Sequence, residues 1–229
     1  MSDSDVLGRL LDAAKAHVPF DGWSDATFRA AISDAGVDEA VALAACPRGA
    51  VGLALAYHEA GDAEMLKRLA GSDLSDMRFR DKVTLAVRLR LEAIEDKELV
   101  RRGMALFSLP HYAPEGVQAV WRTSDRIWTA LGDNANDINW YTKRMTLSGV
   151  YSATVLFWIG DTSDGHENSW AFLGRRIDDV MQIEKIKAQL RENKLVDGLM
   201  AGPLAFLGRI KPPQSGHQTR MPGRWNGPN

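Results

Sequence analysis

Apolar residues recur at the 3.6-residue spacing of an amphipathic helix along almost the whole chain, and this periodicity limits the fold more than any other feature. The clearest example is the segment 139–159, in which one helical face carries Leu147, Val150, Tyr151, Thr154, Val155 and Trp158. No segment shows the alternation of apolar and polar residues expected of a strand on the surface of a sheet. The sequence therefore predicts an all-α protein of about ten helices.

Start and stop signals set the expected bounds of these helices. Ser24 is a capping residue for a helix that runs to about Asp34, where Gly36 ends it, and Pro114 suits the first turn of a later helix. The remaining helices are expected over 4–17, 38–45, 49–70, 73–94, 97–108, 139–159, a segment that includes 170–181, and 189–208.

We expect four parts in the chain. They are a helix-turn-helix-like N-terminal lobe over 1–47, a larger helical domain over 48–188, an amphipathic helix over 189–210 and a disordered tail over 211–229. The tail is assigned from its richness in Pro, Gly and polar residues, which cannot bury enough apolar surface to fold.

The order and spacing of the first three helices resemble the N-terminal domain of TetR-type repressors. A helix that reads base edges needs Arg, Lys, Asn or Gln, but the segment 38–45 offers only acidic and apolar side chains. Asp38 and Glu39 would repel phosphate, and residues 1–47 hold eight acidic residues against three basic ones. We therefore expect the lobe to have a structural role and not to bind nucleic acid.

The segment 190–208 has the composition of a helix that lies in a membrane surface. Its basic residues, Arg191, Lys194, Arg209 and Lys211, suit anionic head groups, and Pro203 must kink or break the helix. The expected membrane-binding residues are Leu195, Val196, Leu199, Met200, Leu204 and Leu207. The alternative, that this apolar face packs on the protein's own body, remains equally open from the residues.

The sequence lacks the common signatures of catalysis. It has no G-x-G-x-x-G, P-loop, H-E-x-x-H or C-x-x-C pattern, and no G-x-S-x-G elbow. The acidic loop around Asp161 is interpreted as a turn before a helix rather than a metal site, and the single cysteine, Cys46, as a small buried apolar residue. We expect no enzymatic activity, no metal and no cofactor.

Aromatic residues gather in the last three predicted helices of the larger domain. Such stripes form either plain core or the wall of an apolar ligand site, and periodicity alone does not separate the two. If a cavity exists, the helical stripes place the following residues on its wall: Leu106, Val120, Trp121, Trp128, Leu147, Val150, Tyr151, Val155, Leu173, Ile177 and Met181.

Residues 103–183 carry a series of motifs that resemble the ubiquinone (coenzyme Q) biosynthesis protein nine family. They are Leu109-Pro110-His111, the segment from Asp125 to Trp128, Gly132-Asp133, the string from Asp137 to Arg144, Trp170-x-Phe172-Leu173 and Arg176-Ile177-Asp178-Asp179. The resemblance implies a TetR-like fold, a homodimer, a lipid cavity for isoprenoid quinone intermediates and a C-terminal amphipathic helix that docks on the membrane. It implies no enzymatic activity.

The same resemblance implies a partner, a hydroxylase of the demethoxyubiquinone type that receives the lipid. The family's contact patch falls here on Asp125, Ile127, Asp137, Trp140 and Tyr141. The start of the chain shows no targeting signal, so we expect a bacterial protein on the inner face of the plasma membrane. The alternatives are a TetR-like regulator with a lipophilic effector and a general fatty-acid or phospholipid carrier.

Overall fold

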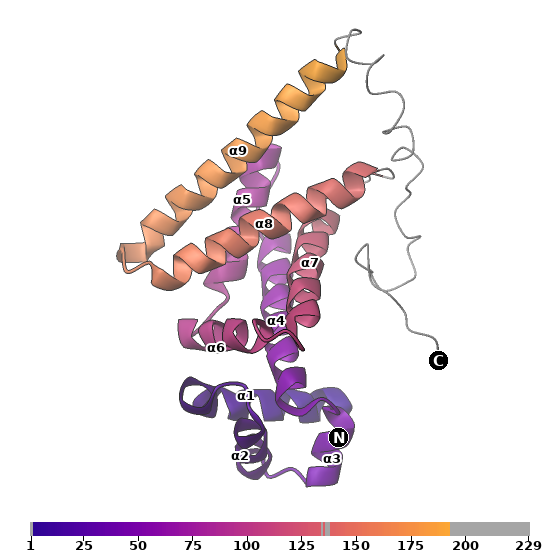
Figure 1. The fold of residues 1–229 in the computed structure, drawn as a ribbon, viewed down its shortest axis with the longest axis vertical. Coiled ribbons are helices and arrows are strands. Elements are labelled where there is room, and N and C mark those ends of the chain that lie inside the picture. The colour runs from indigo at the N-terminus through magenta and orange to yellow at the C-terminus, as the bar shows by residue number, and fades with distance from the viewer. Residues whose placement is uncertain (1, 134, 136–137, 193–229) are drawn as a thin grey trace. The chain divides into compact units, whose positions relative to one another are not determined.

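The computed structural model describes the backbone of residues 2–133, 135 and 138–192, and the side chains up to residue 182. These residues form nine α-helices and one 3₁₀ turn, without a strand, so the all-α prediction is confirmed for the described part of the chain (Figure 1). The helices are α1 (Asp3–Asp21), α2 (Asp25–Ala35), α3 (Glu39–Ala45), α4 (Gly49–Ala70), α5 (Phe79–Glu92), α6 (Lys97–Phe107), α7 (Ala113–Ala130), α8 (Ile138–Gly160) and α9 (Glu167–Glu192), with the 3₁₀ turn η1 at Asp164–His166.

The chain divides into two compact units. The first contains residues 1–68 and 89–119, and the second contains residues 69–88 and the chain from 120 onward. The predicted domain boundary at 47/48 does not coincide with this division. The reason is that Leu53 and Ala54 of α4 are buried in the same apolar core as α1 and α2.

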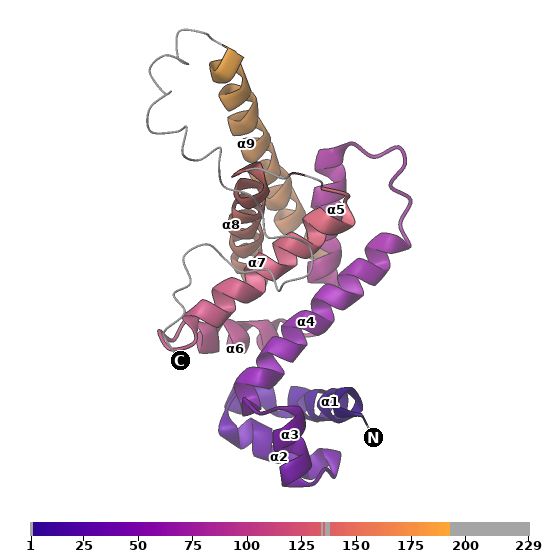
Figure 2. The same cartoon turned by 90° about the vertical axis from the view of Figure 1, so that its right-hand side faces the viewer.

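Local capping explains where the first three helices begin and end. Ser24 Oγ accepts a hydrogen bond from the Thr27 N–H, and the Asp38 carboxylate accepts bonds from the first N–H groups of α3. Gly36 ends α2 in the left-handed conformation, with φ of 58°, which glycine adopts without steric cost. The caps at Ser24 and Gly36 are those that the sequence predicted. Figure 2 shows the three helices packed together.

The core of the first unit is built from the faces that the periodicity predicted. Leu10, Ala14 and Val18 of α1 are fully buried, and Trp23 is buried with its indole N–H bonded to the Leu99 carbonyl at 3.1 Å. Cys46 is a buried free thiol, as expected for a small apolar residue.

The second unit contains the antiparallel pair α8 and α9, joined by η1, with residues 79–88 of α5 and 120–130 of α7 (Figures 1 and 2). All six residues of the predicted α8 stripe are buried. Helix α9 runs without interruption through the expected break near residue 188, so the predicted start of a separate last helix at 189 is wrong. The apolar positions continue one 3.6-residue pattern across that point, and no Pro or Gly interrupts it.

Among the described residues, no single helix is long and apolar enough to cross a membrane, although α3 and α4 pass that test together as a pair bent by 52°. The predicted membrane-binding residues, which run from Leu195 to Leu207, lie outside the described residues, as does the tail over 211–229.

Candidate functional site

The second unit holds a cavity of about 880 Å³ between α5, α7, α8 and α9. Three kinds of groups line it: aliphatic and aromatic side chains, uncharged polar side chains, and a few charged groups. The lining residues are Phe79, Arg80, Val83, Trp128, Gly132, Asp133, Ala135, Asn139, Thr142, Lys143, Thr146, Leu147, Val150, Ile177, Val180 and Met181. The volume falls in the range of small-molecule sites in proteins, roughly 300–1,000 Å³.

Part of the predicted wall lies on this cavity. Trp128, Leu147, Val150, Ile177 and Met181 line it, whereas the other predicted wall residues do not. The other predicted wall residues pack elsewhere. Four of them are buried in the interior of the second unit: Trp121, Tyr151, Val155 and Leu173. Val120 is half-buried, and Leu106 packs against the core of the first unit. For Leu106, which lies in the other unit, the prediction is wrong.

The structure also adds residues that periodicity did not single out. Phe79 and Val83 project from α5, and the Phe79 ring stacks on Trp128 with centroids 5.4 Å apart. Asn139, Lys143 and Thr146 follow one face of α8 at spacings of four and three residues. That spacing could have revealed them, because the same face continues into Leu147 and Val150.

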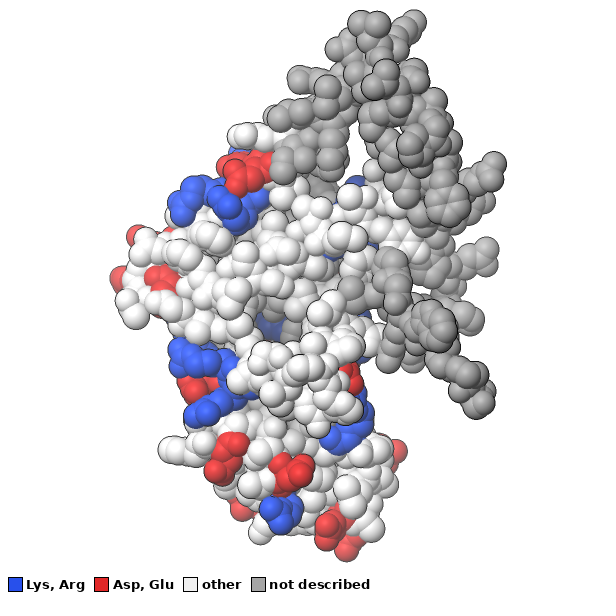
Figure 3. Space-filling model, viewed as in Figure 1, with Lys and Arg blue, Asp and Glu red and all other residues white. Residues whose placement is uncertain are grey.

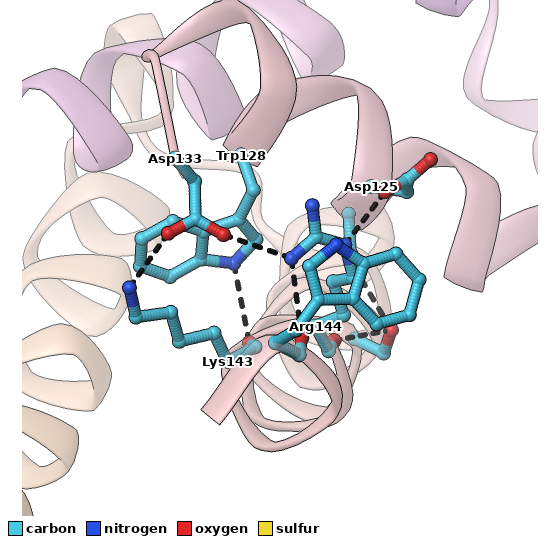
Figure 4. A network of polar contacts seen from close by, with 8 residues as sticks. Asp125, Trp128, Asp133, Lys143 and Arg144 are labelled. Atoms are coloured by element: carbon cyan, nitrogen blue, oxygen red, sulfur yellow. Dashed lines mark hydrogen bonds and ion pairs between the residues drawn. The ribbon is translucent and has the colours of Figure 1, made fainter. Parts of the chain in front are cut away.

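A network of ion pairs borders the cavity where α7 faces the start of α8 (Figure 4). The Arg144 guanidinium donates to Asp125 Oδ1 at 2.6 Å, to Asp133 Oδ2 at 2.9 Å and to the Trp140 carbonyl at 3.1 Å. Asp133 Oδ1 also accepts from Lys143 Nζ at 2.6 Å. The Arg144 guanidinium carbon lies 3.9 Å from the centre of the Trp140 ring, so the cation is held by both charge and an aromatic face.

These contacts keep Asp133 ionised. Burial raises the pKa of the Asp133 carboxyl, but the hydrogen bonds and charges of Lys143 and Arg144 lower it more, and the pKa ends below its usual value. The network therefore sets two acidic side chains, Asp125 and Asp133, against two basic ones, Lys143 and Arg144.

The residues expected to contact a partner protein are distributed unevenly between surface and interior. Ile127 is fully buried and Trp140 is 9% exposed, so these two residues of the expected contact patch offer little surface to a partner. Trp140 is drawn inward because it packs on Arg144 and on Trp121. Asp125 and Tyr141 are half-buried, and Asp137 lies outside the described residues.

The segment 38–45, the candidate for a DNA-reading helix in the sequence, forms α3 with Asp38 as its N-cap. Its exposed side chains include Val41 and Leu43, at 44% and 46% exposure, and the Asp38 carboxylate is used to cap the helix. This surface offers apolar groups and Glu39 where a reading helix needs hydrogen-bond donors for base edges. The absence of nucleic-acid binding stays a prediction.

The turn between α8 and α9 is organised by one carboxylate. Asp161 Oδ1 accepts from the Ser163 N–H at 2.9 Å and hydroxyl at 2.6 Å, and Oδ2 accepts from the Ser169 N–H and hydroxyl at the same two distances. These bonds, those of Ser163 first, hold the pKa of Asp161 far below its usual value. The loop thus acts as the turn predicted from the sequence, positioning the two helices that line the cavity.

Because the pKa of Asp161 is lowered in the folded state, the ionised carboxylate stabilises the fold above about pH 4, the pKa of an unfolded aspartate. We expect that contribution to be lost as the pH falls below 4. Urea unfolding at pH 7 and pH 3 measures it: Asp161→Asn should lower the midpoint at pH 7 and flatten its pH dependence, whereas Asp164→Asn on the same turn should change neither. An unchanged pH dependence in Asp161→Asn would contradict this assignment.

Comparison with known proteins places these features in context. A family model described as COQ9 matches residues 113–184, which include α7, α8 and much of α9. The chain is 28% identical over 227 residues to the mitochondrial ubiquinone biosynthesis protein COQ9 of Rattus norvegicus, covering 90% of this chain and 69% of that protein. The Homo sapiens protein of the same name is also 28% identical, with 90% and 67% covered. A probable ubiquinone biosynthesis protein coq9 of Dictyostelium discoideum is 34% identical over 52% of this chain and 39% of its own.

The fold is that of a solved regulator. The TetR transcriptional regulator from Nitrosomonas europaea ATCC 19718 superposes with a TM-score of 0.62 at 19% identity, covering 75% of this chain and 95% of the regulator's chain. The TetR-like fold expected from the first three helices is therefore confirmed.

Proposed function

This chain belongs to the COQ9 family of ubiquinone biosynthesis proteins, and we propose that it is a non-catalytic accessory protein that binds an isoprenoid quinone intermediate and presents it to a hydroxylase. The observation that carries the proposal is the cavity of about 880 Å³, whose inner wall is aliphatic. A polyprenyl chain is insoluble in water, and each buried CH₂ contributes roughly 0.8 kcal/mol, so such a cavity retains a prenyl tail that water rejects.

The surface around the cavity supports the presentation step. Asp125 in α7 and Tyr141 at the start of α8 keep part of their side chains exposed, and Tyr141 lies between the cavity-lining Asn139 and Lys143 in the sequence. Tyrosine is enriched among the residues that anchor protein interfaces. We propose that these two residues contact the hydroxylase, while the buried Ile127 and Trp140 pack beneath them.

A second copy of the chain is the proposed partner for the outer face of α8. Met145 and Leu156 of this helix are 59% and 61% exposed, and Phe157 stacks on Phe172 of α9 with centroids 4.6 Å apart. Figure 3 shows few charged atoms on the surface around α8, as expected of a face that another apolar surface covers. We also propose that the segment 190–208 places the dimer on a membrane surface.

Filling the cavity should remove the bound lipid without removing the fold. Val150 lines the cavity and Val155 does not, although both lie on α8 and both are 7% exposed. We expect Val150→Phe to lower the amount of prenylated quinone that co-purifies per folded protein by about tenfold, because the added ring occupies the inner cavity. Mass spectrometry of the extracted lipids measures this, and circular dichroism normalises for folded protein.

Val155→Phe is the matched control, because it overpacks the same helix to a similar degree away from the cavity. Equal lipid loss in both variants would assign the effect to general destabilisation and contradict the proposal. Retention of phospholipid or fatty acid in place of prenylated quinone would favour a general lipid carrier.

A further inference from the structure

We propose that the cavity of the second unit binds its ligand with an uncharged, hydrogen-bonding head group at the mouth and the apolar tail inside, and that it discriminates against ligands with phosphate or carboxylate heads. This inference rests on the proposed function, since it assumes that a lipid occupies the cavity. It adds the orientation of that lipid and the residues that select its head group.

Exposure gives the cavity a direction. Val83, Val150 and Ile177 come from three different helices and are 5–7% exposed, which marks the inner end. Phe79 and Met181 also line the cavity, but they are 43% and 38% exposed, which marks the mouth. Each of these two lies about one helical turn along its own helix from its buried counterpart, Val83 or Ile177.

Hydrogen-bonding groups lie at the same end as the exposed residues. Asn139, Thr142 and Lys143 line the cavity two to three turns before Val150 on α8, and Asp133 precedes that helix. Arg80 lines the cavity directly beside Phe79. An apolar tail is therefore most stable inside, where the wall is aliphatic, and ring oxygens are best hydrogen-bonded at the mouth.

The cations at the mouth already have carboxylate partners. Lys143 Nζ lies 2.6 Å from Asp133 Oδ1, a carboxylate that Arg144 also binds. Arg80 pairs with Asp178 of α9 and, at 3.2 Å, with Asp81. An anionic head group would have to separate one of these ion pairs and approach the remaining carboxylate, which costs free energy. A neutral ring can accept hydrogen bonds from the paired side chains without separating them.

Two probes with the same tail test the selection. We expect farnesol to bind the full chain at least about tenfold more tightly than farnesyl diphosphate in isothermal titration, because Arg80 and Lys143, the described cations that line the mouth, already pair with carboxylates. Farnesyl diphosphate binding as tightly as farnesol would overturn the inference.

A matched pair of variants identifies the groups responsible. Asp178→Asn removes a carboxylate from Arg80, and we expect farnesyl diphosphate affinity to rise roughly threefold, in keeping with the modest strength of exposed ion pairs. Asp179→Asn makes the same change of charge on the adjacent residue of α9, which pairs instead with Arg176, and should leave the affinity unchanged. Equal effects of the two substitutions would contradict the assignment to Arg80.

The Val150→Phe variant separates this inference from the proposed function. If it weakens both probes and the wild-type chain still shows no preference for farnesol, the cavity binds lipid but the inference about the head group is wrong. If it weakens neither probe, the lipid does not occupy this cavity, and the proposed function fails as well.

Discussion

Replacing Asp62 by alanine is expected to lower the free energy of unfolding by about 3–5 kcal/mol, because it leaves a buried arginine without its counter-charge. Asp62 is fully buried on α4, and its Oδ1 accepts from Arg90 Nε at 2.6 Å. Arg90 is 3% exposed and also donates to the His58 carbonyl at 3.0 Å. The loss is a large share of the stability of a typical domain, about 5–15 kcal/mol. Urea unfolding followed by circular dichroism measures it.

Glu64→Ala provides the control on the same helix. Glu64 pairs with Arg68 at 2.8 Å and with Lys67 at 3.7 Å, but its side chain is 36% exposed, so the variant should lose far less stability than Asp62→Ala. Hydrogen exchange should show the loss in Asp62→Ala within the first unit, where both partners lie. If the two variants lose equal stability, the buried pair is not a major contribution to the fold.

The buried pair also explains a glycine that the helical pattern of α4 does not favour. A Cβ atom at Gly61 would lie 2.5 Å from Nη1 of Arg90, closer than such atoms approach, so the guanidinium occupies the space that a side chain would need. The helix accepts the propensity cost of glycine, about 1 kcal/mol, in order to admit the arginine beside Asp62.

Helix positions in this protein could be predicted from the sequence because their determinants are local. The α8 stripe from Leu147 to Trp158 is buried as the 3.6-residue pattern requires, and Ser24 and Gly36 bound α2 where capping chemistry places them. The predicted break near residue 188 is wrong, because the sequence has no stop signal there, and the helix predicted from residue 73 begins only at Phe79.

The cavity and the buried ion pairs could not be predicted in this way, because they depend on contacts between distant segments. Tyr151 and Val150 are neighbours with the same apolar character, yet only Val150 lines the cavity. The family resemblance placed Trp140 in a partner-contact patch, but Arg144 lies on the same side of α8 one turn later and packs against its ring. Arg144 itself is buried because it pairs with Asp125 and Asp133, which lie outside α8. The local sequence pattern of α8 does not predict this pairing.

Arg144→Met should therefore destabilise the second unit by about 3–5 kcal/mol, because the substitution leaves the carboxylates of Asp125 and Asp133 without their shared cation. Arg144 is 2% exposed, and it joins both carboxylates and the Trp140 carbonyl. The side chain of Asp133 is only 3% exposed, so Lys143 alone must then compensate a buried charge (Figure 4). Urea unfolding gives the magnitude, and hydrogen exchange in α7 and α8 gives the location.

Two further variants test whether Arg144 stabilises the unit through the paired N–H groups of its guanidinium or through its charge alone. Arg144→Lys keeps the charge but cannot reach both carboxylates with paired N–H groups, so we expect a loss between that of Arg144→Met and the wild type. Arg176→Met removes an exposed arginine of the same unit, 43% exposed and paired with Asp179, and should cost less than about 1 kcal/mol. If Arg144→Met is as mild as Arg176→Met, Asp125 and Asp133 do not depend on Arg144. The inward position of Trp140 would then need another cause.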